Sequence, residues 1–419
     1  MSAIAEPSQS PVPGGPTVEG EERVTLTSYA TQWWTNIRSG ELGSLPIIVG
    51  IIVISIYFQA RNDNFLTSGN FVNLIAQMSA ITVIGMGIVF VLLLGEIDLS
   101  VGYVSGVGGA ICAVLLFPDG NEVATSIALI LAIGGGLAIG LLQGSIITRI
   151  GIPSFVVTLA GLLAWNGVVL KIVGDRGTIV VQDKFVNGIA NDYVDHTVAW
   201  IVIEGAVLLY AATILFGMRR RRAHDLPTDP IALIAIRVAV LAIAGGAVVY
   251  VCNQNANRGL PYVGLLLVAL LIAWTFVLNR TRFGRHVFAV GGNAEAARRA
   301  GINVDRIRVA VFGISGMMAA VGGIIFASRL SSVDTNAGGG SILLYSIAAA
   351  VIGGTSLFGG RGNIKSALLG ALVIASIDNG LGLLNVGDDT KFIVTGVVLL
   401  AAVTVDSLAR RGREHAGRA

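Results

Sequence analysis

Long apolar segments constrain this chain more than any other feature. A transmembrane α-helix needs about 20 mostly apolar residues, and lipid tolerates only segments whose backbone hydrogen bonds are satisfied internally. Apolar runs of this kind recur along most of the chain. They cover residues 44–60, 72–94, 100–117, 124–148, 153–173, 198–217, 231–252, 259–279, 307–328, 342–358, 364–386 and 390–408. The sequence therefore predicts an all-α fold, a polytopic transmembrane helical bundle with about 10–12 membrane segments.

The composition agrees with a membrane environment. Charged residues make up 13% of the chain, against about 25% in soluble domains. Hydrophobic residues make up 54%, and the mean hydropathy is +0.79. The 55 glycines suit transmembrane helices that pack closely. Because the net charge is only +3, we expect no nucleic-acid partner, and the lipid bilayer is the expected surrounding.

The charged ends and loops predict an orientation. Residues 1–43 are polar and rich in proline, without the basic-then-apolar pattern of a signal peptide, and we expect a disordered cytosolic tail. Arginines gather at Arg219–Arg222, in the loop 280–308 and in the basic tail 409–419. Since cytoplasmic loops carry an excess of Lys and Arg, these segments and both termini are expected to be cytosolic. Residues 44–408 then form the transmembrane domain.

Two of the apolar runs are short, and they carry similar glycine-containing segments. The runs 100–117 and 342–358 can be broken or re-entrant, which is tolerated where the backbone is buried in protein or lines a cavity. Residues Gly95–Gly102 align with Gly353–Gly360. This echo is weak by itself, but transporters are commonly built from repeats with interrupted helices. We therefore interpret it as an internal repeat that would need gaps.

Carboxylates interrupt the apolar pattern between two of the runs. Glu96 and Asp98, followed by Ser100, lie where almost no loop separates the runs. A carboxylate at the centre of a spanning helix costs about 2.5–3.5 kcal/mol, so such residues usually face a bundle interior or a wet cavity. The other interpretation is that Leu94–Ser100 is a short surface turn in which Asp98 or Ser100 caps the next helix. The two roles can coexist.

Other polar residues lie well inside apolar runs. Asp378 and Asn379 fall within 364–386, and Asn166 and Gln143 fall within 153–173 and 124–148. Such residues either line a pathway or hydrogen-bond neighbouring helices. The pathway role is favoured for Asp378, and the interhelical role for Asn166 and Gln143. The predicted substrate pathway comprises Glu96, Asp98, Ser100, Asn166, Asp378 and Asn379.

The loop 280–306 contains a short helix with its own end signals. Asn293 is a good N-cap, Glu295 lies in the first turn and Arg298 in the last, and Gly301 suits the left-handed position after the helix. Alanines such as Ala297 give it a narrow surface. A helix specified this well indicates a docking element for a partner, while the alternative is a surface loop without one.

Motifs for chemistry within the chain are missing. The nearest approach to a phosphate-binding loop, Gly359–Ser366, has Ile364 before Lys365 and lies beside a membrane segment. The sequence has neither a catalytic triad pattern nor metal-ligand spacing, so we predict no catalytic and no metal site. The chain is therefore expected to be no enzyme and to bind no cofactor.

Three segments together resemble a known family. They are GEIDLSVG at 95–102, the loop Gly284–Val304, and GGTSLFGGRG at 353–362, which is followed by Asp378 and Asn379. They are similar to the signature segments of ribose/xylose-type permeases, the membrane subunits of ATP-driven (ABC) sugar importers. The resemblance covers residues 70–175 and 275–405. Glu96 departs from it, because the family usually has glycine there.

The resemblance implies partners and a coupling element. It implies a homodimer in the bacterial plasma (inner) membrane, a cytosolic ATP-binding subunit that uses ATP and Mg²⁺, and an extracytoplasmic sugar-binding protein. The loop 280–306 would be the coupling element. Its predicted ATPase-coupling residues are Gly292, Asn293, Glu295, Ala297, Arg298 and Gly301.

The resemblance also suggests a substrate. The additional spans at 197–275 are similar to those of the xylose permease branch, which makes xylose or a related pentose the expected substrate. Two alternatives remain: an ion- or proton-coupled secondary transporter that uses Asp98 and Asp378, and a permease of the same family for a different small polar solute. The signature Ile97–Ser100 disfavours a branched-chain amino acid or a nucleoside as that solute.

Overall fold

The computed structural model describes residues 31, 35, 45–117, 123–224, 228, 230–255 and 259–415. The predicted tail 1–43 lies outside the described residues apart from Thr31 and Thr35. The chain divides into two compact units. One combines Met1–Glu41 with Glu204–Ile243, and its described part is mostly helical. The other combines Leu42–Ile203 with Ala244–Ala419 and carries all the predicted pathway and coupling residues.

Every predicted apolar run contains a helix, although in the run 342–358 the helix ends at Ile352. In chain order the helices are α2 (Leu45–Arg61), α3 (Ser68–Leu93), α4 (Val101–Leu115), α5 (Thr125–Ile150), α6 (Ser154–Val173), α7 (Lys184–Asn191), α8 (His196–Arg222), α9 (Ile231–Asn253), α10 (Tyr262–Arg280), α11 (Arg282–Gly292), α12 (Ala294–Arg299), α13 (Val304–Leu330), α14 (Ile342–Ile352), α15 (Ile364–Leu383) and α16 (Asp388–His415). Within the described residues, eight helices are long and apolar enough to cross a membrane, and α2, α4 and α14 are shorter apolar helices. The predicted polytopic helical bundle is confirmed.

Burial separates central from peripheral helices of the larger unit. In the apolar 18-residue segment of α3, α13 and α15, 78%, 67% and 61% of the residues are buried. In the corresponding segments of α5, α6 and α10, 28%, 17% and 17% are buried. The peripheral helices expose large apolar side chains such as Ile130, Leu163 and Ile272. Glycines let α5 and α13 approach closely, since a Cβ at Gly140 or Gly316 would overlap backbone atoms of the facing helix. Such close backbone approach is how helices associate in lipid.

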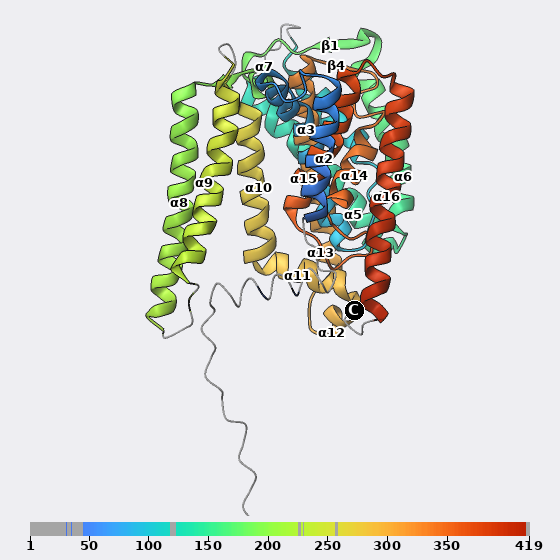
Figure 1. Ribbon diagram of the computed structural model, residues 1–419. Helices are drawn as coiled ribbons and strands as arrows, with labels where there is room; N and C mark the ends of the chain where they lie inside the picture. Colours follow the sequence, from blue (N-terminus) through green and yellow to red (C-terminus); the bar gives the residue numbers. More distant parts are fainter. Residues whose placement is uncertain are drawn as a thin grey trace, which may run out of the picture. The chain divides into compact units, whose positions relative to one another are not determined.

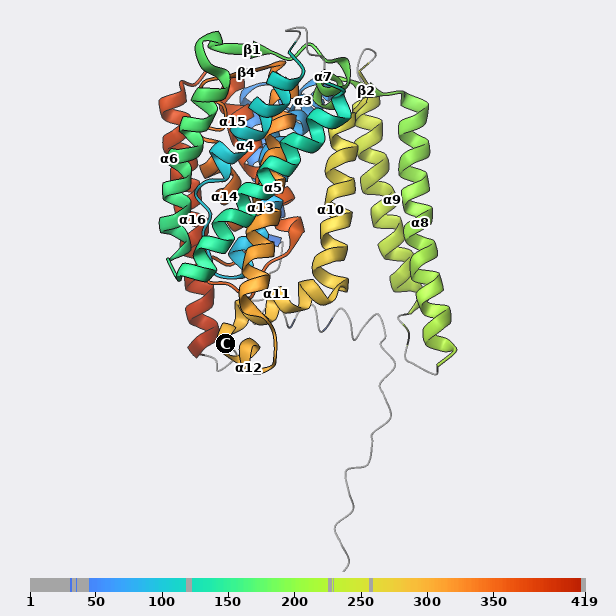
Figure 2. The ribbon, with the colours of Figure 1, turned by 180° about the vertical axis from the view of Figure 1, so that it is seen from behind.

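Small strands and short helices mark opposite ends of this unit. β1 (Thr178–Val180) pairs with β4 (Ser332–Asp334) in antiparallel register, and β2 (Tyr193–Val194) pairs with β3 (Leu260–Pro261). These strands lie at one end together with α7, whereas α11, α12 and the end of α16 lie at the other (Figures 1 and 2). The two ends are called the strand end and the α12 end from here on.

Interrupted helices occur where the two glycine-containing segments were noted. Residues 94–100 between α3 and α4 are not helical, and Gly95 has φ +73°. The expected run 342–358 is helical only to Ile352, because Gly353 and Gly354 follow and Gly354 has φ +99°. At 1.5 Å per residue, α4 and α14 span only about 22 and 16 Å. Neither crosses a hydrocarbon layer of about 30 Å unaided.

Candidate functional site

Asp98 lies in the break between α3 and α4 as the centre of a hydrogen-bond network. Its side chain is 4% exposed. Oδ1 accepts from Ser100 N at 3.0 Å and from Ser100 Oγ at 2.7 Å, and Oδ2 accepts from Ser315 Oγ of α13 at 2.8 Å. Ser100 Oγ also lies 3.0 Å from Gln143 Oε1 of α5. The carboxylate thus connects the start of α4 to the central helix.

The network bears on the two interpretations of this segment. Asp98 accepts from the backbone of Ser100, the N-cap residue of α4, but neither side chain caps the helix, because Ser100 makes no side-chain capping bond and Asp98 lies two residues before it. Asp98 also lines none of the described cavities. Glu96 forms an ion pair with Arg308 of α13, with 3.1 Å between Oε1 and Nε. A buried carboxylate is tolerated when hydrogen bonds satisfy it. Both acids therefore fasten the interrupted segment to α13.

Asp378 lies apart from these acids and lines a cavity of 160 Å³. The cavity lies between α3, α13, α14 and α15, and its polar lining includes Gln77, Arg329, Tyr345 and Asp378. The negative charge of Asp378 acts electrostatically on Arg329. No ion pair within 4.0 Å joins the two among the described residues. Two opposite charges thus face one cavity without direct pairing.

The neighbouring Asn379 points elsewhere. It is 7% exposed, and it exchanges hydrogen bonds with Asn70 of α3, with 2.8 Å from Asn70 Nδ2 to Asn379 Oδ1 and 3.0 Å from Asn379 Nδ2 to Asn70 Oδ1. It also donates to Gln77 Oε1 at 3.3 Å. Asn166 is half-buried on α6 and lines none of the described cavities. The six predicted pathway residues therefore occupy different places, and Asp378 alone among them lines a described cavity.

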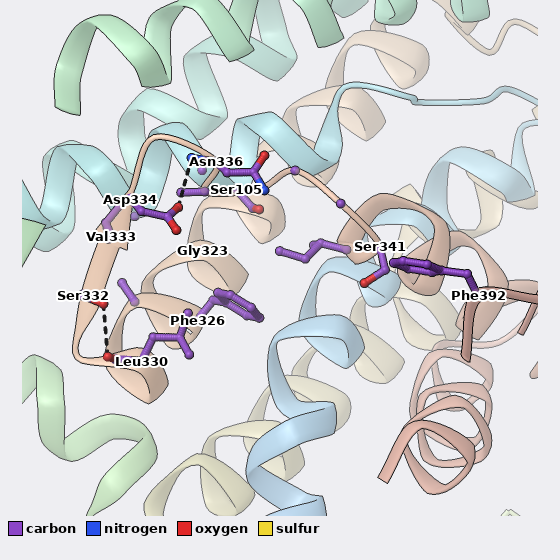
Figure 3. Close-up of a pocket in the computed structure, with 18 residues that line it drawn as sticks. Ser105, Gly323, Phe326, Leu330, Ser332, Val333, Asp334, Asn336, Ser341 and Phe392 are labelled. Carbon is purple, nitrogen blue, oxygen red and sulfur yellow. Dashed lines mark hydrogen bonds between the residues drawn. The ribbon is translucent and has the colours of Figure 1, made fainter. Parts of the chain in front are cut away.

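A second cavity, of 270 Å³, lies beside β4 and the chain that leads into α14. Figure 3 shows Asp334, Asn336 and Ser341 around it together with Phe326 and Phe392. Sequence reasoning missed these residues and also Arg329. The available signal was the polar, glycine-rich stretch 332–341 between two apolar runs, which has the composition of an ordinary loop.

The predicted short helix is present as α12 and is capped as expected. Asn293 Oδ1 accepts from Ala296 N at 2.9 Å, and Gly301 has φ +84°. Glu295 pairs with Arg298 at 3.0 Å and Arg299 at 3.3 Å, and all three side chains are more than half exposed.

Ala297 differs from its neighbours on α12. It is 4% exposed and belongs to the core of the chain itself. The surface that α12 leaves free for a partner is therefore formed by its charged side chains, with Gly292 also exposed beside it.

Three glycine-rich segments meet where α11 ends, next to α12. A Cβ at Gly291 would overlap the carbonyl oxygen of Leu93, and one at Gly359 would lie 2.9 Å from the Gly291 oxygen and 3.0 Å from Gly95 N. Gly360 N donates to Leu93 O at 2.9 Å. We call this contact the glycine junction. It joins the helix before α12 to both interrupted segments, 94–100 and 353–363.

The described residues offer no cluster for metal chemistry. No group of three or more His, Cys, Asp or Glu side chains that could hold an ion occurs in the described part of the chain. Cys112 and Cys252 are buried free thiols.

Comparisons with known proteins place these features in context. Residues 70–403 match the family described as branched-chain amino acid transport system / permease component. The xylose transport system permease protein XylH of Escherichia coli is 35% identical over 93% of this chain and 98% of its own length. XylH of Haemophilus influenzae is 33% identical over 88% and 98%, and the ribose import permease protein RbsC of E. coli is 31% identical over 92% and 98%. No solved structure matches the chain.

Proposed function

Because the chain belongs to this family of transport-system permease components, we propose that it is the membrane-spanning permease subunit of an ATP-driven importer for a monosaccharide, xylose or a related pentose. The observation that carries the proposal is the cavity between the helices that Arg329 and Asp378 both line. Ionisable residues at such depth mark substrate paths when they line a cavity. The choice of xylose as the proposed substrate rests on the two relatives that are named for xylose transport.

The α12 end is assigned to the cytosol in this proposal. Its loop carries Arg282, Arg298, Arg299 and Arg306, and cytoplasmic loops of membrane proteins are enriched in such residues. The end of α16 lies at the same end of the unit. Both termini are then cytosolic, and the strand end faces outward from the bacterial inner membrane.

The coupling element of the proposal is α12 with the glycine junction. A cytosolic ATP-binding subunit, which carries the ATP and Mg²⁺, would bind the exposed Asn293, Glu295 and Arg298, with Gly292 and Gly301 at the ends of the helix. Its movement would reach residues 94–100 and 353–363 through backbone contacts of the junction. Ala297 then acts by seating α12 on the core.

The remaining residues of the predicted pathway receive supporting roles. Asp98 and Ser100 brace the interrupted segment, Glu96 fastens it to Arg308, and Asn379 links α15 to α3. Asn166, which lies half-buried on α6, is assigned no contact with the substrate. Asp378 is the residue assigned to contact the substrate.

Two further partners complete the proposed importer. A second copy of the chain forms a homodimer in the bilayer, and an extracytoplasmic sugar-binding protein delivers the substrate to the strand end. At that end β1, which follows α6, pairs with β4, which follows α13, and the pair offers an ordered surface for docking.

Reconstitution of the complete complex in proteoliposomes tests the proposed function. The vesicles contain the chain, its ATPase and its sugar-binding protein, and labelled xylose uptake is followed with ATP or with a proton or sodium gradient. The proposal predicts uptake that needs ATP and is reduced by unlabelled pentoses. Uptake driven by a gradient without ATP would support a secondary transporter, and competition by leucine or a nucleoside in place of pentoses would support a different solute.

A further inference from the structure

The 270 Å³ cavity beside β4, called the outer cavity from here on, owes its shape to an irregular stretch of backbone. Between β4 and α14 the chain runs through residues 335–341 without regular structure, and residues 336–341 form one wall of the cavity. Non-helical backbone between membrane segments is tolerated where it is buried in protein or lines a cavity. In transporters, substrate sites lie at interrupted helices of this kind. The position of the cavity is therefore that of a substrate site.

Glycine contacts hold this stretch against α4. A Cβ at Gly106 would overlap the carbonyl oxygen of Ala337, and one at Gly338 would overlap that of Gly102. Gly338 also has φ +81°, which disfavours other residues. The backbone of 337–338 thus rests directly on α4. This contact fixes the neighbouring polar side chains at the cavity, where Asn336 N donates to Asp334 Oδ1 at 3.0 Å.

The outer cavity adjoins the cavity of Asp378. Phe326, Ser341 and Ile342 line both spaces. Arg329 and Asp378 therefore lie on the far side of the residues that the two cavities share.

The lining of the two cavities suits a hydroxyl-rich solute without net charge. Because Arg329 and Asp378 carry opposite charges, the pair together favours neither a free cation nor a free anion. A hydroxyl group donates and accepts, which lets it donate to the carboxylate and accept from the guanidinium. Phe326 and Phe392 offer apolar surface for the C–H face of a sugar ring (Figure 3).

We propose that the outer and inner cavities form one monosaccharide route through this chain, with a receiving subsite at Asp334, Asn336 and Ser341 and a selecting subsite between Arg329 and Asp378. The route rests on the proposed function, because it assumes that a sugar is carried. It adds residues to which neither the motifs nor the comparisons assign a role.

Chemical modification of the outer cavity tests the receiving subsite. Asn336→Cys in the complete complex is treated with a negatively charged, membrane-impermeant thiol reagent, and ATP-driven xylose uptake is measured before and after treatment. Asp175→Cys is the control, because Asp175 is exposed on the 3₁₀ turn Gly174–Arg176 after α6 and outside the described cavities. The native thiols Cys112 and Cys252 are buried. We expect modification to block uptake in Asn336→Cys and to spare Asp175→Cys.

Single and double substitutions test the selecting subsite. Arg329→Gln and Asp378→Asn are each expected to lower uptake about tenfold or more, as for loss of a hydrogen bond to a charged group. The double variant should lose less than the product of the single losses, because the two residues act on one solute. Asp175→Asn, at an exposed residue outside the described cavities, serves as the control, and ATPase co-purification shows assembly of each variant.

The outcomes separate this route from the proposed function. If the wild type takes up xylose and modified Asn336→Cys does so fully, the route is overturned but the proposed function is retained. The same holds if the losses multiply in the double variant. Absence of ATP-driven uptake of any pentose by the wild-type complex would overturn the proposed function and the route with it.

Discussion

Asp98 shows how a membrane protein can hold a charge in its core. Isolated carboxylates are costly there, but Asp98 accepts hydrogen bonds from a backbone amide and from two hydroxyl groups. The donors belong to Ser100 and Ser315, which lie on different elements. The side chain therefore determines how the start of α4 sits against α13, and a change at this residue should act through structure.

Replacement of Asp98 should first be visible as lost stability. Asp98→Ala removes the acceptor of the buried donors Ser100 N and Ser315 Oγ, at about 1–3 kcal/mol for such groups. We expect a lower melting temperature of the purified protein in detergent, and Asp98→Asn should lose less because one oxygen remains. Asp175→Ala, an exposed control, should leave melting unchanged. A normal melting temperature for Asp98→Ala would contradict the bracing role.

Asn379 gives a second prediction at this scale. Asn379→Ala removes the paired amide contact with Asn70 and the contact with Gln77, which joins α15 to α3. We expect a loss of about 0.6–1.7 kcal/mol, from the average to the largest value measured for interhelical hydrogen bonds in a membrane protein. Thermal melting measures it. If Asn379→Ala abolished uptake at unchanged melting temperature, Asn379 would belong to the pathway instead.

Among the elements, α11 and α12 link the surface to the interrupted helices. Gly291 and Gly292 are adjacent, yet their surroundings differ, since a methyl group at Gly291 overlaps the Leu93 oxygen and one at Gly292 meets nothing within 4 Å. Gly291→Ala should therefore displace the junction, so that ATPase binding persists while ATP-driven uptake falls. Gly292→Ala is the matched control. Equal uptake by both variants would remove the glycine junction from coupling.

The charged face of α12 leads to a separate prediction. The ion pairs of Glu295 are exposed and contribute about 0–1 kcal/mol at most, so Arg298→Glu should leave the melting temperature nearly unchanged. It should weaken co-purification of the ATP-binding subunit. Asp175→Lys is the charge-changing control at the strand end. Undiminished ATPase recovery with Arg298→Glu would place the docking surface elsewhere, with Arg219–Arg222 as the next candidate.

The sequence predicted elements better than it predicted contacts. Each apolar run contains a helix, because its length and hydropathy leave few other solutions in lipid. β1 and β4 were missed because strands of three residues carry no readable period, and they pair across a separation of more than 150 residues. Ala297 could not be assigned to the core or the surface, because alanine carries no such signal. Asp378 was identified as a charge in an apolar run. Arg329, which lines the same cavity, was missed because it lies at the end of a different run.

Orientation is a property of the whole molecule and can be tested on intact cells. Ala296 is exposed on α12 and Asp175 is exposed at the strand end. Ala296→Cys should resist a membrane-impermeant maleimide added outside and should react after the membrane is made permeable, whereas Asp175→Cys should react directly. The reverse pattern would invert the topology and remove α12 as a docking site for a cytosolic ATPase.

The central claim is that this chain carries a monosaccharide past Asp378 when a partner hydrolyses ATP. The most direct measurement is labelled xylose uptake by proteoliposomes that hold equal amounts of assembled wild-type or Asp378→Asn complex, each with and without ATP. The account predicts ATP-dependent uptake by the wild type and a loss of about tenfold or more in the variant, the scale of a lost hydrogen bond to a charged group. Equal ATP-dependent uptake by both complexes would contradict the role of Asp378, and no uptake by the wild type would contradict the function itself.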